Sequence, residues 1–471
     1  MVTSKNSHWM ILVAAGLCGC GGTSGATPTK ATTNPQPDGT HVAAPPGSKT
    51  YDPAQGFVVH EWGTNTIVVG TDGVLLPGLH HEEEDLPAFV YDRMKATQLG
   101  APFRDTVNTK METPVDYFYA SAPLKVNVEV SFPKGILTQW YPATSAFGPQ
   151  LVAPAGGVPA DPVLDPKFPF TQESCRTELA RAEGGFLRWQ DVQVMGRTEK
   201  PTLMDAPLDR YSWSYARDVA ANPLRVPAPA YDAKSAPQDE DFLFYRGLGN
   251  VPLPVTVTAQ AGAPGFDGGV RLQNTDIANA MGAVVVMRVG ETGGAFTIHR
   301  EGIPSGGTLE DVAPSLDGQL PMNEFVAKLS DAVVNQLALT GLYGDEAAAM
   351  VNTWKRQWFR TPGVRVLYLM PQAWTDTQIP LTIDPVPAKT VRVMMIRVEV
   401  LTRSLEEGDF KAALAIETEG TAGAGAAHFT ALGRFAEPRL RRALALGAGG
   451  KNGAALLAEM GGTGIGSRQS E

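Results

Sequence analysis

Cysteine is scarce in this chain, whose 471 residues include three, at positions 18, 20 and 175. Cys18 and Cys20 stand at the end of an apolar segment near the N-terminus, so the rest of the chain contains Cys175 alone. Cys175 has no partner for a disulfide there, even in an oxidising compartment, and stability has to come from apolar burial. Charged and hydroxyl side chains flank Cys175, which we interpret as an inert thiol rather than a nucleophile.

Positive charge is also in short supply. The chain has 39 Lys and Arg against 49 Asp and Glu, which gives a formal net charge of −10. Because nucleic-acid affinity comes largely from phosphate neutralisation, we expect no nucleic-acid partner. The main basic cluster, at residues 434–442, is interpreted as a solvated helix face. Beyond residue 20, the longest apolar stretch is 280–289, well short of the ~18 residues that a transmembrane helix needs.

Several catalytic signatures are missing from the sequence. It contains no G-x-S-x-G elbow, no phosphate loop, no dinucleotide fingerprint and no H-E-x-x-H motif. Glycine (50 residues) and proline (37 residues) are abundant instead, which indicates many turns and a β-rich architecture. Any functional site must therefore be sought in less familiar strings.

Residues 9–20, WMILVAAGLCGC, are the most informative stretch of the chain. An apolar run too short to span a bilayer follows a weakly basic lead, a pattern typical of an export signal. The string LCGC at 17–20 resembles the bacterial lipobox, in which cleavage precedes a cysteine that receives lipid. This resemblance implies that Cys20 is lipidated. Cleavage before Cys18, or an ordinary secretory signal, remains an alternative.

Lipidation would anchor the protein to a membrane through its N-terminus. Gly21 and Gly22 follow Cys20, so the aspartate that commonly retains such proteins at the inner membrane is absent. By resemblance this favours an outer-membrane lipoprotein of the cell envelope that faces the periplasm or the cell surface. The segment 20–50 has almost no large apolar residues, so it is predicted to be a flexible tether.

Alternating and helical patterns predict the elements of the body. Residues 124–132 alternate apolar and polar side chains, which predicts a strand with one face in solvent. Helices are predicted over 172–182, 322–340, 345–359, 406–416 and 438–446. We expect a β-rich α+β fold, with antiparallel sheets or sandwiches and a few packed helices in the C-terminal half.

The same patterns divide the chain into five expected parts. A lipoprotein signal peptide (1–19) and the tether (20–50) precede a β-rich domain at 51–240, which contains the strings HEWGT and METPV. A second domain at 241–446 is expected to combine a small β-sandwich with helices. A Gly-rich disordered tail is expected at 447–471.

The first candidate site is HEWGT at 60–64, where a strand is expected to end. Alternation would direct His60 and Trp62 to one face of that strand and Glu61 to the other. His60 is a candidate metal ligand and Glu61 a candidate catalytic carboxylate. In the alternative interpretation His60 is a hydrogen-bonded sheet histidine and Trp62 belongs to the core.

The second candidate is HHEEED at 80–85, the densest cluster of metal-ligand residue types in the chain. Its functional interpretation joins His80 or His81 to His60 and Glu112, which folding would have to bring together around a divalent metal such as Zn. Its spacing matches neither a zincin helix nor an EF-hand loop. The alternative is a solvated acidic loop.

The third candidate is METPVDYFY at 111–119. A glycoside-cleaving site needs two carboxylates about 5 to 10 Å apart, and aromatic rings often floor a sugar site. Glu112 paired with Glu61 or Glu84 would supply the carboxylates. The candidate aromatic platforms are Trp62, Tyr117, Trp140 and Tyr141, all of which can equally be core residues.

Three strings carry a resemblance: FVVHEWGT at 57–64, METPVDYFY at 111–119, and the stretch 345–402. They resemble a functionally uncharacterised family of secreted proteins from myxobacteria and planctomycetes. The resemblance spans much of the chain and implies an extracytoplasmic setting, with the three strings in one architecture. It transfers neither a catalytic residue nor a fold.

Two functions are compatible with these features. The first is a lipid-anchored envelope protein with a binding or structural role, which recognises a glycan or a protein. The second is an envelope hydrolase acting on a glycan or peptide, either metal-assisted through His60, His80, His81 and Glu112, or carboxylate-paired through Glu61 and Glu112.

Overall fold

The computed structural model describes residues 41–92, 107–149, 183–229, 235–260, 267, 269–311 and 315–463. The expected signal peptide, Cys20, Cys175 and the expected helix at 172–182 lie outside these residues. Residues 39–471 cluster as one unit. In the part of the chain that the structure describes, no helix is long and apolar enough to cross a membrane.

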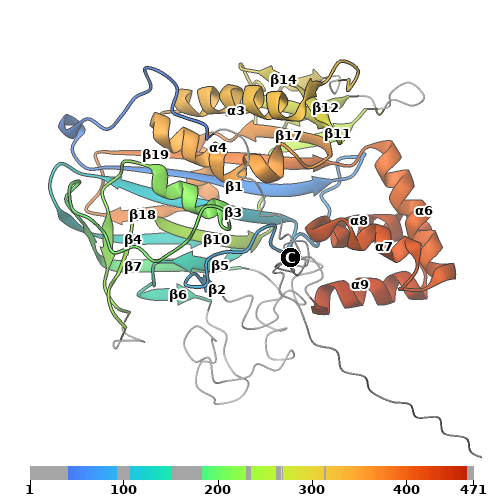
Figure 1. Cartoon of the computed structure of the whole chain (residues 1–471), viewed down its shortest axis with the longest axis horizontal. Helices are drawn as coiled ribbons and strands as arrows, with labels where there is room; N and C mark the ends of the chain where they lie inside the picture. Colours follow the sequence, from blue (N-terminus) through green and yellow to red (C-terminus); the bar gives the residue numbers. More distant parts are fainter. Residues whose placement is uncertain are drawn as a thin grey trace, which may run out of the picture. The chain divides into compact units, whose positions relative to one another are not determined.

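Two of the three strings, together with the end of the third, form neighbouring strands at the centre of a ten-stranded sheet (Figure 1). β1 (Val58–Val69) pairs in parallel with β19 (Lys389–Val400) and antiparallel with β3 (Thr109–Tyr119). Every residue of β1 and β3 is buried, so these strands are covered on both faces. The sheet order is β16-β14-β13-β17-β19-β1-β3-β10-β5-β2.

The remaining strands of this sheet come from both halves of the sequence. They are β2 (Tyr91–Asp92), β5 (Gly135–Tyr141), β10 (Leu243–Gly249), β13 (Val284–Val289), β14 (Gly293–His299), β16 (Leu320–Pro321) and β17 (Gly363–Leu369). The sheet therefore takes strands from both ranges that were expected to be separate domains.

HEWGT lies inside β1 and not at a strand end, which corrects the sequence-based expectation. The pairing of β1 with β3 is irregular between Trp62 and Thr64, opposite a kink at Thr113, which has a φ of 50°. A Cβ on Gly63 would come within 3.1 Å of both Met394 Cε and Pro114 Cγ. Gly63 therefore permits close packing at this irregularity and does not form a turn.

Two smaller antiparallel sheets cover one face of the large sheet. One contains β4 (Leu124–Phe132), β6 (Ala146–Gly148), β7 (Gly185–Val194), β8 (Leu224–Val226), β9 (Gln238–Glu240) and β18 (Leu381–Asp384). The other contains β11 (Val255–Ala259), β12 (Val270–Asn274) and β15 (Thr308–Asp311). The predicted strand at 124–132 is confirmed, and its polar residues are exposed or half-buried.

Helices cover the opposite face of the large sheet. α3 (Met322–Leu339), α4 (Gly344–Trp358) and the 3-10 helix η3 (Ser212–Asp218) pack there around a second apolar core (Figure 1). Trp354 and Trp358 of α4 stack in this core, with ring centroids 5.3 Å apart. The short helix α5 (Gln372–Gln378) packs against β19.

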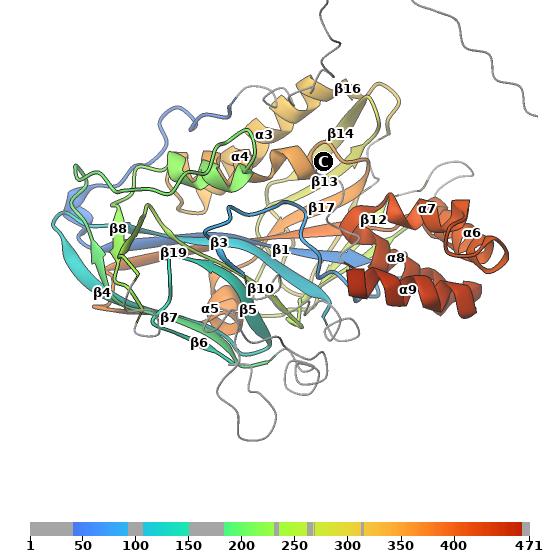
Figure 2. The same cartoon turned by 60° about the horizontal axis from the view of Figure 1, so that its bottom comes forward.

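The C-terminal helices form a group beside the strands, visible in both views (Figure 2). This helical bundle comprises α6 (Arg403–Glu419), α7 (Ala424–Thr430), η5 (Gly433–Phe435), α8 (Ala436–Ala443), η6 (Leu444–Ala448) and α9 (Lys451–Thr463). Helix α9 lies in the range expected to be a disordered tail, where residues such as Leu456 and Met460 pack in the core of the bundle. The predicted β-rich α+β fold, with helices in the C-terminal half, is confirmed.

Candidate functional site

His60 is a hydrogen-bonded histidine inside the sheet. Its Nδ1 lies 2.8 Å from Oε2 of Glu346, which stands in the first turn of α4. The same carboxylate accepts hydrogen bonds from the Tyr119 hydroxyl (2.6 Å) and the Tyr343 backbone N–H (2.6 Å). His60 and Glu346 are fully buried. The interpretation of His60 as a sheet histidine is therefore the one that the structure bears out.

The candidate aromatic platforms are core residues. Trp62, Tyr117 and Trp140 are completely buried, and Tyr141 is nearly so. The Tyr117 hydroxyl donates to the Ala216 carbonyl at 2.8 Å, and the Trp140 ring lies 4.9 Å from that of Phe147. None of these four rings lies at the surface, where it could stack against a bound sugar.

Glu61 points to the face of β1 opposite His60, as alternation predicted. Its carboxylate accepts from the Arg392 guanidinium at 2.9 Å and from the Tyr245 hydroxyl at 3.0 Å. Asp116 stands directly across the strand pair from Glu61. Burial, reinforced by the charge of Glu61, raises the pKa of Asp116 well above its ordinary value. The folded state therefore favours the protonated form of Asp116.

Glu112 lies on the other face of the sheet from Glu61. It accepts from the Thr66 hydroxyl at 2.6 Å and from Arg434. Thr66 and Glu61 are five positions apart on a regularly paired strand, so their side chains point to opposite faces. Burial would raise the pKa of Glu112, but Arg434 and two further cations lower it to about 2. The structure does not bring Glu61 and Glu112 together as a carboxylate pair.

The HHEEED loop is clamped by cations and is not a solvated acidic loop. Glu82 lies 2.7 Å from Lys110 and 2.6 Å from Arg246, on strands β3 and β10. Glu83 lies 2.7 Å from Arg397 of β19 and 2.8 Å from Arg434 of the bundle. Lys110 also donates to the carbonyl of His80 at 3.2 Å.

Glu84 differs from its two neighbours in the loop. It accepts a hydrogen bond from the Ser212 hydroxyl at 2.9 Å. Burial raises the pKa of Glu84 to about 7; the Ser212 hydrogen bond opposes this shift, while the charge of Glu83 adds to it. Glu84 therefore titrates near neutrality. Burial would also raise the pKa of Glu82, but Lys110 and Arg246 outweigh it and lower that pKa below its ordinary value.

His80 and His81 meet a carboxylate that the sequence analysis did not identify. Nε2 of His80 lies 3.5 Å, and Nε2 of His81 3.9 Å, from Oε2 of Glu437 in the first turn of α8. One ligand atom from each residue lies within 4.8 Å of those of the other two. His60 pairs with Glu346 and Glu112 pairs with Arg434, whereas the two histidines meet Glu437.

This His80–His81–Glu437 group has the residue types and separations of a metal centre. Distances of 3.5 and 3.9 Å are too long for hydrogen bonds. They are close to the edge of a tetrahedron around Zn²⁺, which is about 3.4 Å for ligand bonds of about 2.1 Å. Arg441 donates to the other oxygen of Glu437 at 2.9 Å and orients the carboxylate. The side chain of His81 is 14% exposed, whereas those of His80 and Glu437 are 1% exposed.

Gly78 leaves room for Glu437 to come close to the histidine loop. Gly78 has a φ of 108°, and a Cβ on it would lie 2.9 Å from Cγ of Glu437. Glu437 could not be predicted from the sequence, because it stands far along the chain beside arginines that suggested a solvated face. The helix-start signal of Pro438 is the one local cue. The arginines are not solvated: each of Arg434, Arg439, Arg441 and Arg442 pairs with a carboxylate.

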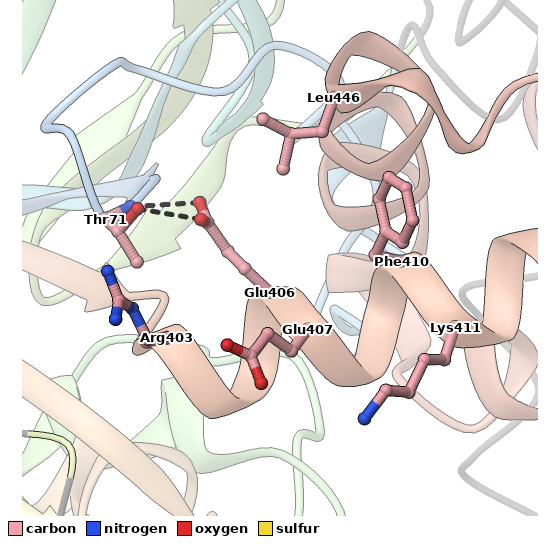
Figure 3. A pocket seen from close by; sticks show the side chains of 7 residues that line it. All are labelled: Thr71, Arg403, Glu406, Glu407, Phe410, Lys411 and Leu446. Carbon is pink, nitrogen blue, oxygen red and sulfur yellow. Dashed lines mark hydrogen bonds between the residues drawn. The ribbon is translucent and has the colours of Figure 1, made fainter. Parts of the chain in front are cut away.

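A pocket of about 410 Å³ lies along one side of α6 (Figure 3). Its lining residues are Thr71, Arg403, Glu406, Glu407, Phe410, Lys411 and Leu446. The Glu406 carboxylate accepts hydrogen bonds from the Thr71 N–H (3.0 Å), the Thr71 hydroxyl (2.7 Å) and Arg442 (2.8 Å). Phe410 and Leu446 form the apolar side of the pocket, and the charged side chains of Arg403, Glu407 and Lys411 are exposed at its edge.

No protein-family model matches the chain, and no curated protein sequence matches it. Among solved structures, the chain is similar to the yeast delta-COP-I mu-homology domain, with a TM-score of 0.24 and 8% sequence identity. That similarity covers 74% of this chain and 98% of that domain. So low a TM-score supports no inference about function, which has to be argued from the geometry of the chain itself.

Proposed function

We propose that the protein is a lipid-anchored, extracytoplasmic protein of the bacterial envelope with a binding or structural role. The observation that supports a binding or structural role is the state of Glu61 and Glu112, the two residues of the expected carboxylate pair, and of Glu82 and Glu83 beside the histidines. Inside the sheet, Glu61 is bound by Arg392 of β19, and Glu112 is bound by Arg434 of the bundle. Glu82 and Glu83 are each bound by two cations. Carboxylates neutralised in this way are poor general bases.

The anchor is tested in cells that express the full chain. Feeding an alkyne fatty acid should label the wild-type protein and place it in the outer-membrane fraction. Cys20→Ser should abolish both the label and the membrane association, because it removes the acceptor thiol. Cys18→Ser is the matched control and should change neither. Labelling that survives Cys20→Ser would refute anchoring at this residue.

The cofactor of this proposed function is a divalent metal such as Zn, bound by His80, His81 and Glu437. An ion bound by ligands from a loop and from a helix would join two parts of the fold. Elemental analysis of the full-length protein, purified in detergent without chelators, should find one ion per chain. His80→Ala and Glu437→Gln should lose it, and His428→Gln, which alters a histidine paired with Asp409, should retain it.

A metal-assisted envelope hydrolase is the second candidate. Two observations favour it: three ligands leave a fourth position for water, and His81 reaches the surface. Against it, Glu82 and Glu83 beside the histidines are already held by cations. Zinc-dependent hydrolysis of envelope glycans or peptides by wild-type protein, abolished in Glu437→Gln, would establish it. Binding of an envelope glycan or protein without turnover would favour the first role.

A further inference from the structure

The helical bundle has a core of its own. Its apolar cluster contains Ala413, Ile416, Ala426, Phe429, Ala436, Leu440, Ala443, Ala448, Leu456 and Met460, which all belong to helices α6 to α9 and the turns between them. The two large cores beside the sheet contain no residue of this cluster. Packing within the bundle therefore does not depend on its contact with the sheet.

The apolar contact between the bundle and the sheet is small by comparison. It consists of Val68, Leu76, Leu79 and Leu401, on which Phe435 of the bundle packs. Ion pairs also join the two parts: Arg434 pairs with Glu112 and Glu83, and Arg442 pairs with Asp72 at 3.0 Å. Such ion pairs give modest net stabilisation because their charges must be desolvated. The junction thus combines a small apolar contact with several ion pairs.

The His80–His81–Glu437 group lies at this junction. The two histidines come from the loop that crosses the sheet, and Glu437 comes from α8, next to Arg434 and Phe435. The histidine loop is in turn fixed to the sheet through Lys110, Arg246 and Arg397. An ion coordinated by all three residues would therefore join a loop fixed on the sheet to a helix of the bundle.

We infer that metal occupancy at His80, His81 and Glu437 controls the docking of the bundle on the sheet, so that this centre is a metal-responsive clamp. This inference rests on the metal of the proposed function. Helix α6 follows β19 directly in the chain, so loss of the ion does not release the bundle but lets α8 move away from the loop. The pocket on α6 lies at the same junction, between Thr71 and the bundle.

Linkage gives the size of the effect. A ligand that binds the docked state alone suppresses opening by the factor 1 + [L]/Kd, which is about 100 when free zinc is 100 times its Kd. Hydrogen exchange in the full-length protein in detergent measures this opening. Amides in residues 78–86 and 433–443 should exchange about 100-fold more slowly with zinc than with EDTA. Amides of β1 should respond little, because they open with the sheet.

Two variants separate the clamp from general loosening. Glu437→Gln removes a ligand, and the two junction segments should then exchange at the same rate with zinc and with EDTA. Glu406→Gln is the matched control: it removes a carboxylate that joins α6 to Thr71 and Arg442 but belongs to no metal group. Its exchange should be faster overall and should still slow about 100-fold with zinc.

Elemental analysis of the same samples distinguishes the two ways of failing. An ion bound stoichiometrically, with unchanged exchange in residues 78–86 and 433–443, would overturn the clamp and leave the metal centre standing. Absence of a bound ion would overturn both. Zinc-dependent slowing that persists in Glu437→Gln would also overturn the clamp, because the ion would then act elsewhere.

Discussion

His60 and Glu61 are adjacent on β1, yet their side chains bind partners on opposite faces of the ten-stranded sheet. His60 contacts Glu346 of α4, and Glu61 contacts Arg392 of β19. Both pairs are almost fully buried. The string that suggested a catalytic site thus provides two separate buried pairs, one between the sheet and α4 and one between two neighbouring strands of the sheet. Buried pairs of this kind specify how layers fit together more than they stabilise them.

Removing His60 should destabilise the protein strongly. His60→Leu leaves Glu346 buried with the Tyr119 hydroxyl and one backbone N–H but without its imidazole partner, and we expect a loss of about 3 kcal/mol in the free energy of unfolding. Denaturant unfolding followed by tryptophan fluorescence measures it. His41→Ala is the control, because His41 pairs with Asp218 at the surface, and it should cost less than about 0.5 kcal/mol. Equal losses in the two variants would contradict this role of the pair.

Asp116 should make stability fall as pH rises. Its pKa in the folded state is raised above the unfolded value of about 3.9, so the folded state binds the extra proton. The stabilising contribution is complete below about pH 4 and is lost as pH rises towards the folded pKa, at about 1.4 kcal/mol per pH unit. Asp116→Asn imitates the protonated group and should flatten this decline between pH 5 and 9 in urea unfolding. A variant as pH-sensitive as the wild type would refute the assignment.

Local patterns predicted the elements well, because strand alternation and helix amphipathicity depend on neighbours in sequence. The strand at 124–132 and the helices at 322–340 and 345–359 lie within one residue of the observed bounds. The predicted end of the strand at HEWGT was wrong because Gly63 was interpreted as a turn residue. In the structure, Glu346 of α4 pairs with His60 and Arg392 of β19 pairs with Glu61, and β1 continues through them.

The candidate site was half predictable. His80 and His81 stood out as metal-ligand residue types, but their carboxylate partner comes from α8 and not from β3. Alternation alone could not choose between Glu112 and Glu437, because the choice depends on how the bundle packs. Arg434 decides it by pairing with Glu112 and so removing that carboxylate from the set of ligands.

The pairing of Arg434 with Glu112 should make the stability of the protein fall in acid. Arg434 is the chief cause of the lowered pKa of Glu112, about 2 against an ordinary 4.5, so the pair contributes stability above about pH 4.5 that is lost as pH falls to 2. The contribution is on the order of 3 kcal/mol. Arg434→Met should be less stable at pH 7 and should lose little more between pH 4.5 and 2.5, as measured by urea unfolding. Arg225→Met, at a half-exposed pair with Asp239, is the control with a smaller effect. A steep acid limb retained in Arg434→Met would contradict the assignment.

The metal centre should require Gly78 for two reasons: a side chain there would displace Glu437, and its backbone conformation is one that other residues rarely adopt. Gly78→Ala places a methyl group 2.9 Å from Cγ of Glu437, at a φ of 108° that side chains rarely adopt. Gly447→Ala imposes nearly the same backbone strain, at a φ of 103°, but meets no atom within 4 Å. Both variants should lose about 1 kcal/mol of stability from strain, measured by denaturant unfolding. Only Gly78→Ala should also weaken zinc binding, by about tenfold in titration calorimetry, because Glu437 is displaced from the two histidines. Equal zinc affinity in the two variants would show that Glu437 is not a ligand.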